Sequence, residues 1–382
     1  MRNQHECGSV VKVFNQKLQM EGFQMTLKEK YDVVIVGSGP AGAGAAKALS
    51  GSGLDILVVE RQKMPRYKMC SGIVFPSSRK FIEENFGEIP RDIMCTPEII
   101  KGNRVFVTNE DPVLEVSFDA FDAGEDSAGE GFNTWRSDLD QWLISQSDAA
   151  VADDCSFESF QKSGDEYQIQ VNHRKTSKPV TCRYIIGADG TLSRVRKTLY
   201  PDFNQSIVRI PNYEEIYTGT IELDPGWLYL FMDRSVTGYF ATIFHKDDKI
   251  AVVTGVNEKE SVKEYFKVFK THLLKNHGLQ IKETYATHGI VLTDMSAQKN
   301  YCLGDANVLL SGEAAGFLRG GEGITSSLAS GYAAGKAVVE SEQSGKPAID
   351  YYLDLAADEL KACETVHATL TEVMGYNVFM RP

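Results

Sequence analysis

The sequence predicts an α/β fold in which a parallel-sheet domain, assembled from separated pieces of the chain, carries an inserted antiparallel β-sheet domain. Short β-branched runs that end in glycine turns recur at 33–36, 184–187 and 307–311, as in parallel strands covered on both faces. Residues 205–257 instead alternate β-branched and aromatic residues between turn signals, which is typical of antiparallel strands. The 382 residues leave room for about two domains.

The first strand is followed at once by a glycine turn with a specific spacing. Gly37, Gly39 and Gly42 have the G-x-G-x-x-G arrangement directly after the run 33–36. The first glycine permits a tight turn, the second lets the backbone approach a pyrophosphate, and the third lets helix and strand pack closely. The pattern predicts a Rossmann-like unit that binds a dinucleotide.

An alanine-rich helix and a second buried strand complete this unit. We expect the helix to run from Ala41 to Ser50, with Pro40 and Ala41 close to the phosphates, where the helix macrodipole favours negative charge. Glu60 ends the second strand, at a place where a carboxylate can accept hydrogen bonds from a ribose hydroxyl. The predicted binding residues include the adjacent Arg61.

The remaining pattern predicts the other elements in order. Helices are expected near 77–86, at 137–150 with Ser137 or Asp138 as N-cap, and then at 259–276, 323–341 and 348–376. We expect the chain to divide into four parts. A mobile extension at 1–27 precedes a nucleotide-binding domain made of 28–103, 133–200 and 290–342. Residues 104–132 and 201–289 form a sheet domain for substrate and catalysis, and 343–382 form a helical segment.

Composition restricts the possible partners and the cellular compartment. The net charge of −12 and the scattered Lys and Arg residues argue against nucleic acid. No apolar run is long enough to span a bilayer, although peripheral contact with a membrane stays possible. Seven cysteines without a C-x-x-C pair favour free thiols in the cytoplasm, and neither these nor the dispersed histidines suggest a metal site.

Three separated motifs together resemble a known family. They are the glycine turn, the segment GADGTLSRVR at 187–196, and the pair SGEAAGF at 311–317 and GEGI at 321–324. The segment PRYKMCSG at 65–72 is similar to a P-x-x-K-x-C-x-G motif of the same family. Over residues 31–340 the chain resembles FAD-dependent oxidoreductases of the geranylgeranyl reductase family, which have the p-hydroxybenzoate hydroxylase-like flavoprotein fold.

The resemblance implies an extended FAD held at both ends. It places Glu60 on the adenosine ribose, Asp189 and Gly190 near the pyrophosphate, and Arg136 within reach of the cofactor. It also implies contacts from the turn before the 323–341 helix, whose positive end would point at the flavin ring; the residues concerned are Gly312, Glu313, Gly321, Gly323 and Ile324. Cys70 and Ser71 would lie beside the flavin.

The sequence departs from the family pattern in three places. The loop Leu318–Gly320 is two residues shorter than the usual flavin-covering loop and lacks its proline, and His245 stands where the family has proline. Glu313 replaces the family's aspartate and is one methylene longer. Because the first two changes fall where substrate would meet the flavin, an isoprenoid substrate does not follow from the resemblance alone.

Three residues are candidates for catalysis, each with a structural alternative. Cys70 is either a thiol that donates a proton beside the flavin, activated by nearby cations, or an inert cysteine. His245 is either an acid or base on the sheet or a solvated turn residue. Arg319 either holds an anionic substrate or compensates the charge of the reduced flavin, or is an ordinary surface charge.

Three functional hypotheses remain open. The first is an FAD-dependent reductase of a carbon–carbon double bond in an apolar substrate, isoprenoid-like or other, with hydride from flavin N5. Since no second G-x-G-x-x-G occurs, its electrons would come from transiently bound NAD(P)H or from a protein such as ferredoxin. The second is a monooxygenase; a halogenase is disfavoured because the W-x-W-x-I-P signature is absent. The third is a non-catalytic flavin-binding protein.

Overall fold

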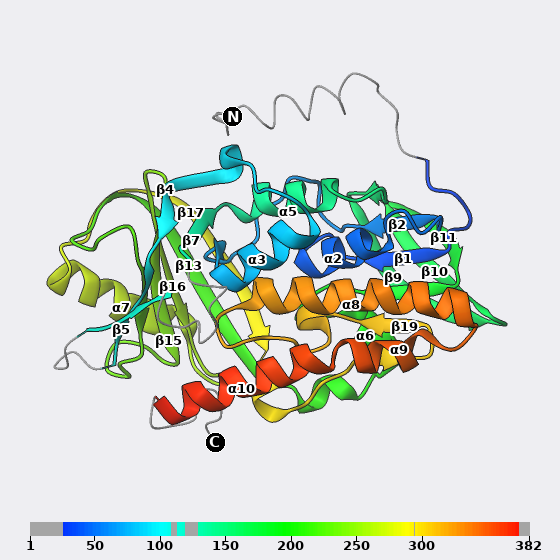
Figure 1. The fold of residues 1–382 in the computed structure, drawn as a ribbon. Coiled ribbons are helices and arrows are strands. Elements are labelled where there is room, and N and C mark those ends of the chain that lie inside the picture. The colour runs from blue at the N-terminus through cyan, green and yellow to red at the C-terminus, as the bar shows by residue number, and fades with distance from the viewer. Residues whose placement is uncertain (1–25, 108–112, 119–128, 294, 374–382) are drawn as a thin grey trace.

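The computed structural model describes residues 26–107, 113–118, 129–293 and 295–373 (Figure 1). Most of the expected N-terminal extension, the acidic glycine-rich stretch at 119–128 and the last nine residues lie outside this part of the chain. The described residues form two larger sheets, each with its own hydrophobic core, joined through a small three-stranded sheet.

A six-stranded sheet forms the centre of the first part. Its strand order is β18-β19-β12-β1-β2-β8, and all neighbouring strands are parallel except β18 and β19. The strands are β1 (Val33–Val36), β2 (Ile56–Val59), β8 (Ala150–Ala152), β12 (Tyr184–Gly187), β18 (Gly304–Asp305) and β19 (Val308–Leu310). Strands far apart in the sequence therefore form one sheet, as expected for a discontinuous domain.

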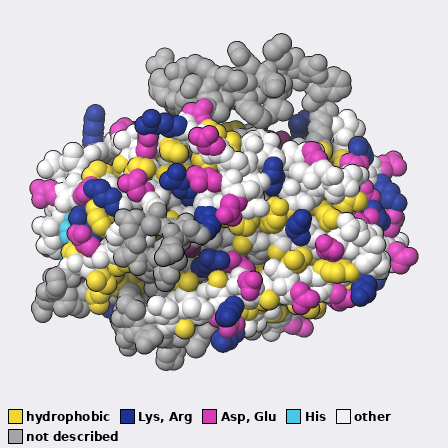
Figure 2. All heavy atoms as spheres, viewed as in Figure 1, with side chains coloured by type: hydrophobic (Ala, Val, Ile, Leu, Met, Phe, Trp, Pro, Cys, Tyr) yellow, Lys and Arg dark blue, Asp and Glu magenta, His cyan; other side chains and the backbone are white. Residues whose placement is uncertain are grey.

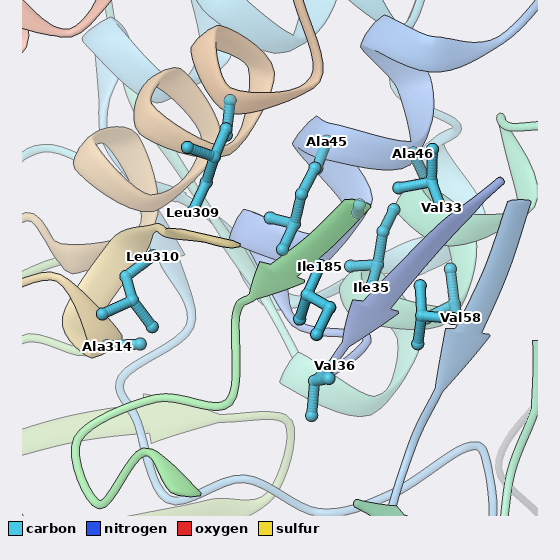
Figure 3. Close-up of a cluster of buried hydrophobic side chains, with 14 of the residues drawn as sticks. Val33, Ile35, Val36, Ala45, Ala46, Val58, Ile185, Leu309, Leu310 and Ala314 are labelled. Carbon is cyan, nitrogen blue, oxygen red and sulfur yellow. The ribbon is translucent and has the colours of Figure 1, made fainter. Parts of the chain in front are cut away.

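Helices α2 (Pro40–Leu49) and α8 (Gly323–Ser344) lie side by side against this sheet (Figure 1). Glycines make the close approach possible: a Cβ on Gly331 would lie only 2.0 Å from the backbone oxygen of Ala41. Figure 3 shows Ala45 and Ala46 of α2 close to Val33 and Ile35 of β1 in the buried core. Small residues on α2 are thus required by packing, and the glycine turn at its start is held firmly.

Further elements surround the six-stranded sheet. Helices α3 (Pro76–Asn85), α5 (Arg136–Ser145), α6 (Arg194–Leu199), α9 (Ala348–Leu355) and α10 (Ala357–Val373) belong to this part, together with an antiparallel sheet of β9 (Cys155–Ser163), β10 (Glu166–His173) and β11 (Thr176–Cys182). The small connecting sheet consists of β3 (Ile73–Val74), β7 (Gly131–Thr134) and β4 (Met94–Ile100).

The second part is a seven-stranded sheet with two different faces. Its order is β17-β13-β16-β15-β14-β5-β6, antiparallel except for the β14–β5 pair. The strands are β5 (Gly102–Phe106), β6 (Leu114–Ser117), β13 (Arg209–Thr220), β14 (Leu228–Phe231), β15 (Phe240–Lys246), β16 (Lys249–Gly255) and β17 (Gln280–Thr293). Helix α7 (Val262–Asn276) covers one face, and Met69 and Ile73 from the first part pack on the other.

The predicted architecture is confirmed, with corrections at element ends. Helix α5 begins at Arg136 after Trp135, so neither Ser137 nor Asp138 is its N-cap. The residues expected to form one C-terminal helix form two, because the helix is interrupted at Ala356 between α9 and α10. Strands β5 and β17 cross the expected boundaries at 103 and 289.

The described residues contain neither a membrane-spanning helix nor a metal-binding cluster. No helix among them is long and apolar enough to cross a membrane. They also hold no group of His, Cys, Asp and Glu side chains arranged to bind a metal ion. On the face shown in Figure 2, Lys and Arg side chains are interspersed with Asp and Glu.

Candidate functional site

The glycine turn after β1 has the geometry that its spacing predicts. Gly37 has φ +105°, and a Cβ there would lie 2.4 Å from the backbone oxygen of Ala188. A Cβ on Gly42 would lie 1.9 Å from the oxygen of Gly37. Gly39 differs, because its nearest neighbours would be guanidinium nitrogens, 3.6 Å away for Arg66 and 3.9 Å for Arg136. The turn therefore faces two cations.

Those two arginines belong to a buried ion-pair network. Arg66 Nε lies 3.1 Å from Glu60 and its Nη1 3.0 Å from Asp140. Arg136 donates to both oxygens of Asp140, at 2.8 and 2.9 Å, one turn along α5. Sequence reasoning named Arg136 and Glu60 as cofactor residues, whereas Arg66, in the 65–72 motif, was named only as a cation near Cys70. The network fixes both guanidinium groups next to the glycine turn.

Glu60 is buried and accepts several hydrogen bonds. Ser38 donates to it from both its backbone nitrogen, at 3.2 Å, and its hydroxyl, at 2.9 Å, and Gln62 donates from its backbone at 3.0 Å. The carboxylate is thus oriented beside the end of β2. The side chain of Arg61 next to it is exposed.

The segment after β12 and the turn before α8 meet each other. Asp189 Oδ2 accepts from the backbone nitrogens of Arg194 and Val195, while its buried Oδ1 has no partner among the described residues. Thr191 donates to Glu313 Oε2 at 2.6 Å. A Cβ on Gly323 would be 3.7 Å from Glu313 Oε1, so this carboxylate lies beside the start of α8.

The other residues expected at this turn are placed as follows. The Gly312 nitrogen donates to the Ser330 hydroxyl at 2.9 Å, and Ile324 is buried in the core. Around Gly190 and Gly321 nothing would lie within 4 Å of a Cβ, so both face open space.

These features fit an elongated dinucleotide with a pyrophosphate. Two guanidinium groups at Gly39 supply positive charge, and Glu60 can accept from ribose hydroxyls. The partnerless Asp189 Oδ1 and the open space at Gly190 and Gly321 leave room for a ligand with hydroxyl groups. The residues present therefore match what FAD requires.

Cys70 lies next to this network on the loop between β2 and β3. Its Sγ accepts from the Gly72 nitrogen at 3.4 Å and lies within electrostatic range of the buried Arg136. Cys70 is half-buried, whereas the other described cysteines are buried. Ser71 accepts from the Ile73 nitrogen through its hydroxyl at 3.4 Å.

His245 and Lys246 point to opposite faces of β15. His245 pairs with Ile250, whose side chain belongs to the core under α7, so His245 faces away from the glycine turn. Burial lowers the pKa of His245 to about 4. Lys246 is buried on the other face, where its Nζ donates to Asn133 Oδ1 at 2.8 Å and to the Thr134 oxygen. Lys246, which sequence reasoning did not name as a candidate, is therefore the residue of this pair on the face toward the glycine turn.

Arg319 is occupied by an ion pair rather than exposed to solvent. It donates from Nε to Glu359 Oε1 at 2.7 Å and from Nη2 to Oε2, which ties the loop before α8 to helix α10. The Glu359 pair raises the pKa of Arg319. Arg319 also lines a hollow of about 230 Å³ with residues of α3 and α8, including Ser77, Lys80 and Thr325.

Tyr67 and Glu214 form a further polar pair on the face of the seven-stranded sheet where the side chain of Lys246 lies. Tyr67, from the same loop as Cys70, donates its hydroxyl hydrogen to Glu214 Oε2 on β13. The ring of His288 stacks on Tyr67 with centroids 4.0 Å apart. Burial raises the pKa of Glu214 to about 7. Sequence reasoning missed this pair, which only the strand register brings together.

Comparison with known proteins finds a family match in the first part of the chain. Residues 30–213 match the family described as FAD binding domain. The match covers a little under half of the chain and shows what these residues are similar to. Protein CbrA of Escherichia coli (strain K12) is 26% identical over 310 residues, which cover 78% of this chain and 82% of CbrA.

Several solved structures share the overall fold of this chain. A geranylgeranyl bacteriochlorophyll reductase-like protein from Thermoplasma acidophilum has TM-score 0.71 at 17% identity, covering 92% of this chain and 94% of its own. Aklavinone-11 hydroxylase, solved with FAD and aklavinone, has TM-score 0.68 at 18% identity, covering 91% and 70%. The myxobacterial chondrochloren halogenase has TM-score 0.70 at 14% identity, covering 93% and 84%. The predicted p-hydroxybenzoate hydroxylase-like fold is confirmed.

Proposed function

We propose that this protein is an FAD-dependent oxidoreductase that reduces a carbon–carbon double bond in an apolar substrate, as members of the geranylgeranyl reductase family do. The observation that most directly supports this proposal is the position of Cys70. Its thiol lies within electrostatic range of Arg136, which also faces the glycine turn, and it sits on the loop that packs on the seven-stranded sheet. A thiol in that position can hold a proton at Sγ for transfer to a substrate carbon.

The chain's own residues would hold the cofactor at both ends. Arg66 and Arg136 would neutralise the pyrophosphate at Gly39, and Glu60 would accept from the adenosine ribose. Asp189 Oδ1 and Glu313 would accept from hydroxyl groups of the ribityl chain or lie beside the phosphates. When bound, FAD supplies hydride chemistry at N5.

The character of the sheet supports an apolar substrate. The face turned toward the FAD binding domain carries a continuous apolar cluster that includes Ile216, Leu228, Phe244 and Val253. An isoprenoid or another hydrocarbon chain placed there would be shielded from water, which favours hydride chemistry over side reactions.

The proposed source of electrons for the flavin rests on the absence of a second dinucleotide-binding motif from the sequence. With no second G-x-G-x-x-G, we propose that NAD(P)H binds transiently or that a ferredoxin-like protein delivers electrons. The free thiols of all six described cysteines support a reducing compartment such as the cytoplasm.

A monooxygenase is the second candidate. The 187–196 segment resembles that of flavin hydroxylases, and the fold is shared with aklavinone-11 hydroxylase. A flavin-binding protein without catalysis is a third and weaker candidate, because it leaves the Cys70 contacts without a purpose.

Turnover without oxygen distinguishes these functions. The flavin-loaded protein is reduced by dithionite under strict anaerobiosis and mixed with alkenes such as geranylgeranyl diphosphate. Return of the oxidised flavin spectrum together with a saturated product supports the reductase. Product formation only after oxygen is admitted supports the monooxygenase, and an unreactive reduced flavin supports a binding protein.

A further inference from the structure

Glu214 stands apart from the other buried acids. Four acidic side chains are buried in the described part of the chain: Glu60, Asp140, Glu214 and Glu359. Glu60 and Asp140 each form an ion pair with Arg66, and Glu359 forms one with Arg319. Glu214 is fully buried, yet no Lys, Arg or His nitrogen of the described residues lies within 4.0 Å of it. Its charge, if present, would be uncompensated.

The immediate surroundings of Glu214 satisfy only one of its oxygens. Tyr67 donates to Oε2, while the buried Oε1 has no hydrogen-bond partner among the described residues. The other titratable groups that face it are His288, which is its cross-strand neighbour on β17, Cys70 on the loop of Tyr67, and Lys246 on β15. Lys246 exerts a favourable charge effect on Glu214 without touching it.

A carboxyl group in this position is best stabilised as the neutral acid. Burying a carboxylate without an ion-pair partner costs several kcal/mol, and proteins avoid that cost by protonation. Because Tyr67 already donates to Oε2, the proton of the neutral acid belongs on Oε1. Burial raises the pKa of Glu214, which also favours the neutral acid.

We propose that Glu214 is a proton-donating acid of this site, which carries its proton on Oε1 and delivers it to the substrate. The proposal rests on the reductase function proposed above. Glu214 breaks its Oε1–H bond and the proton forms one new C–H bond of the product, while hydride supplied by the reduced cofactor forms the other. The resulting carboxylate keeps the Tyr67 hydrogen bond and the attraction of Lys246, and it regains a proton from solvent between turnovers.

The location supports this assignment. Tyr67 and Cys70 lie on one loop, close enough for the charge of Cys70 to affect the pKa of Tyr67, and Cys70 is within electrostatic range of Arg136 beside the glycine turn. Glu214 lies on the sheet face that this loop covers. The site therefore contains two candidate proton donors, Cys70 and Glu214, on the two sides of the interface between loop and sheet.

The strand offers a matched control. Glu215, the next residue, points to the opposite face, where Lys270 pairs with it at 3.0 Å and Tyr213 and Tyr217 donate to it. These contacts lower its pKa. Glu215→Gln thus removes a carboxyl group from the same strand without touching the proposed donor.

Infrared spectroscopy of the purified flavin-loaded protein tests the protonation directly. Between about pH 5 and about pH 9, we expect a carbonyl band of a protonated carboxylic acid to disappear with a midpoint near pH 7. The band should be missing in Glu214→Gln and unchanged in Glu215→Gln. In Tyr67→Phe its midpoint should rise, because the Tyr67 hydrogen bond lowers the pKa of Glu214. A band that survives in Glu214→Gln, or a Glu214 ionised throughout this range, overturns the proposal.

Kinetics then separate proton donation from the overall function. Reoxidation of the reduced flavin by an alkene should slow by about 10²- to 10⁴-fold in Glu214→Gln, and its dependence on pH near 7 should disappear. Glu215→Gln should react like the natural protein. If Cys70→Ala abolishes reoxidation while Glu214→Gln leaves rate and pH profile intact, Glu214 is not the donor. If the natural protein reduces no alkene, the proposed function fails and donation by Glu214 fails with it, whereas the infrared result still reports where its proton resides.

Discussion

The guanidinium group of Arg319 and the carboxylate of Glu359 form a two-point ion pair, although 40 positions separate them in the chain. The pair joins the loop before α8 to helix α10 and is mostly shielded from water, with side chains 23% and 6% exposed. Because Nε and Nη2 of Arg319 both donate to Glu359, this two-donor edge of the guanidinium group is not available to a substrate anion. The last described helix is therefore connected to the loop where the flavin ring is expected.

Loss of this partner should destabilise the protein. Glu359→Gln leaves the partly buried charge of Arg319 uncompensated, and we expect the free energy of unfolding to fall by about 3 kcal/mol. Chemical denaturation measures the change. Asp358→Asn, an exposed neighbour on α10, should cost less than about 0.5 kcal/mol. Equal effects of the two substitutions would show that the ion pair contributes little.

Two glycines around α8 should respond differently to alanine. In Gly331→Ala the new Cβ would meet the Ala41 backbone oxygen at 2.0 Å, so α2 and α8 must separate, at a cost of more than about 4 kcal/mol. Gly321→Ala meets nothing within 4 Å and should fold normally. If FAD fills that space, Gly321→Ala should weaken FAD binding by about tenfold or more, measured by flavin fluorescence. Unchanged affinity would place the cofactor elsewhere.

Cys70 should be the most reactive thiol of the described residues. It is the half-buried cysteine among them, and burial raises the pKa of Cys95, Cys155 and Cys182 to about 11 or 12. In a Cys7→Ser background, iodoacetamide should modify Cys70 first, and bound FAD should slow the reaction. Mass spectrometry of peptides checks the site. Preferential labelling of a buried cysteine would contradict the placement of this loop.

Substitutions of two neighbouring residues on β15 should have different effects, because their side chains lie on opposite faces of the strand. Lys246→Met removes the hydrogen bonds to Asn133 and Thr134 that join the seven-stranded sheet to β7, and we expect a loss of about 2 kcal/mol together with impaired turnover. His245→Gln changes the face under α7 and should leave turnover within about twofold of the natural rate. Strong loss of anaerobic activity in His245→Gln alone would restore His245 as a catalytic candidate.

Glu214 should make stability depend on pH. Its pKa is raised from 4.5 to about 7 in the fold, so the folded chain binds more protons than the unfolded chain between these values. Stability from this group is therefore present at low pH and lost as pH rises toward 7, by on the order of 3 kcal/mol in total. Glu214→Gln should flatten this part of the profile in thermal unfolding measured from about pH 4 to about pH 8. If the profile of Glu214→Gln ran parallel to that of the natural protein, the pKa of Glu214 in the fold would have its ordinary value.

The sequence was most informative where a backbone constraint dictates the residue. Gly37 and Gly42 could be assigned because their spacing matches a turn that admits no side chain, and Arg136 and Cys70 followed from family motifs. The faces of β13 and β15 could not be assigned in the same way. Glu214 and Glu215 are adjacent identical residues, and only strand register shows which one is buried opposite Tyr67.

The pairing of α2 with α8 also bears on how the protein is made. The ribosome releases the nucleotide-binding turn early, but the helix that seals α2, and strand β19 beside β12, emerge only after the whole seven-stranded sheet has been synthesised. Until then the apolar flank of α2 has no native cover, so we expect nascent chains to aggregate more readily than the complete chain. Truncation before residue 323 should accordingly yield insoluble protein rather than a smaller working flavin carrier.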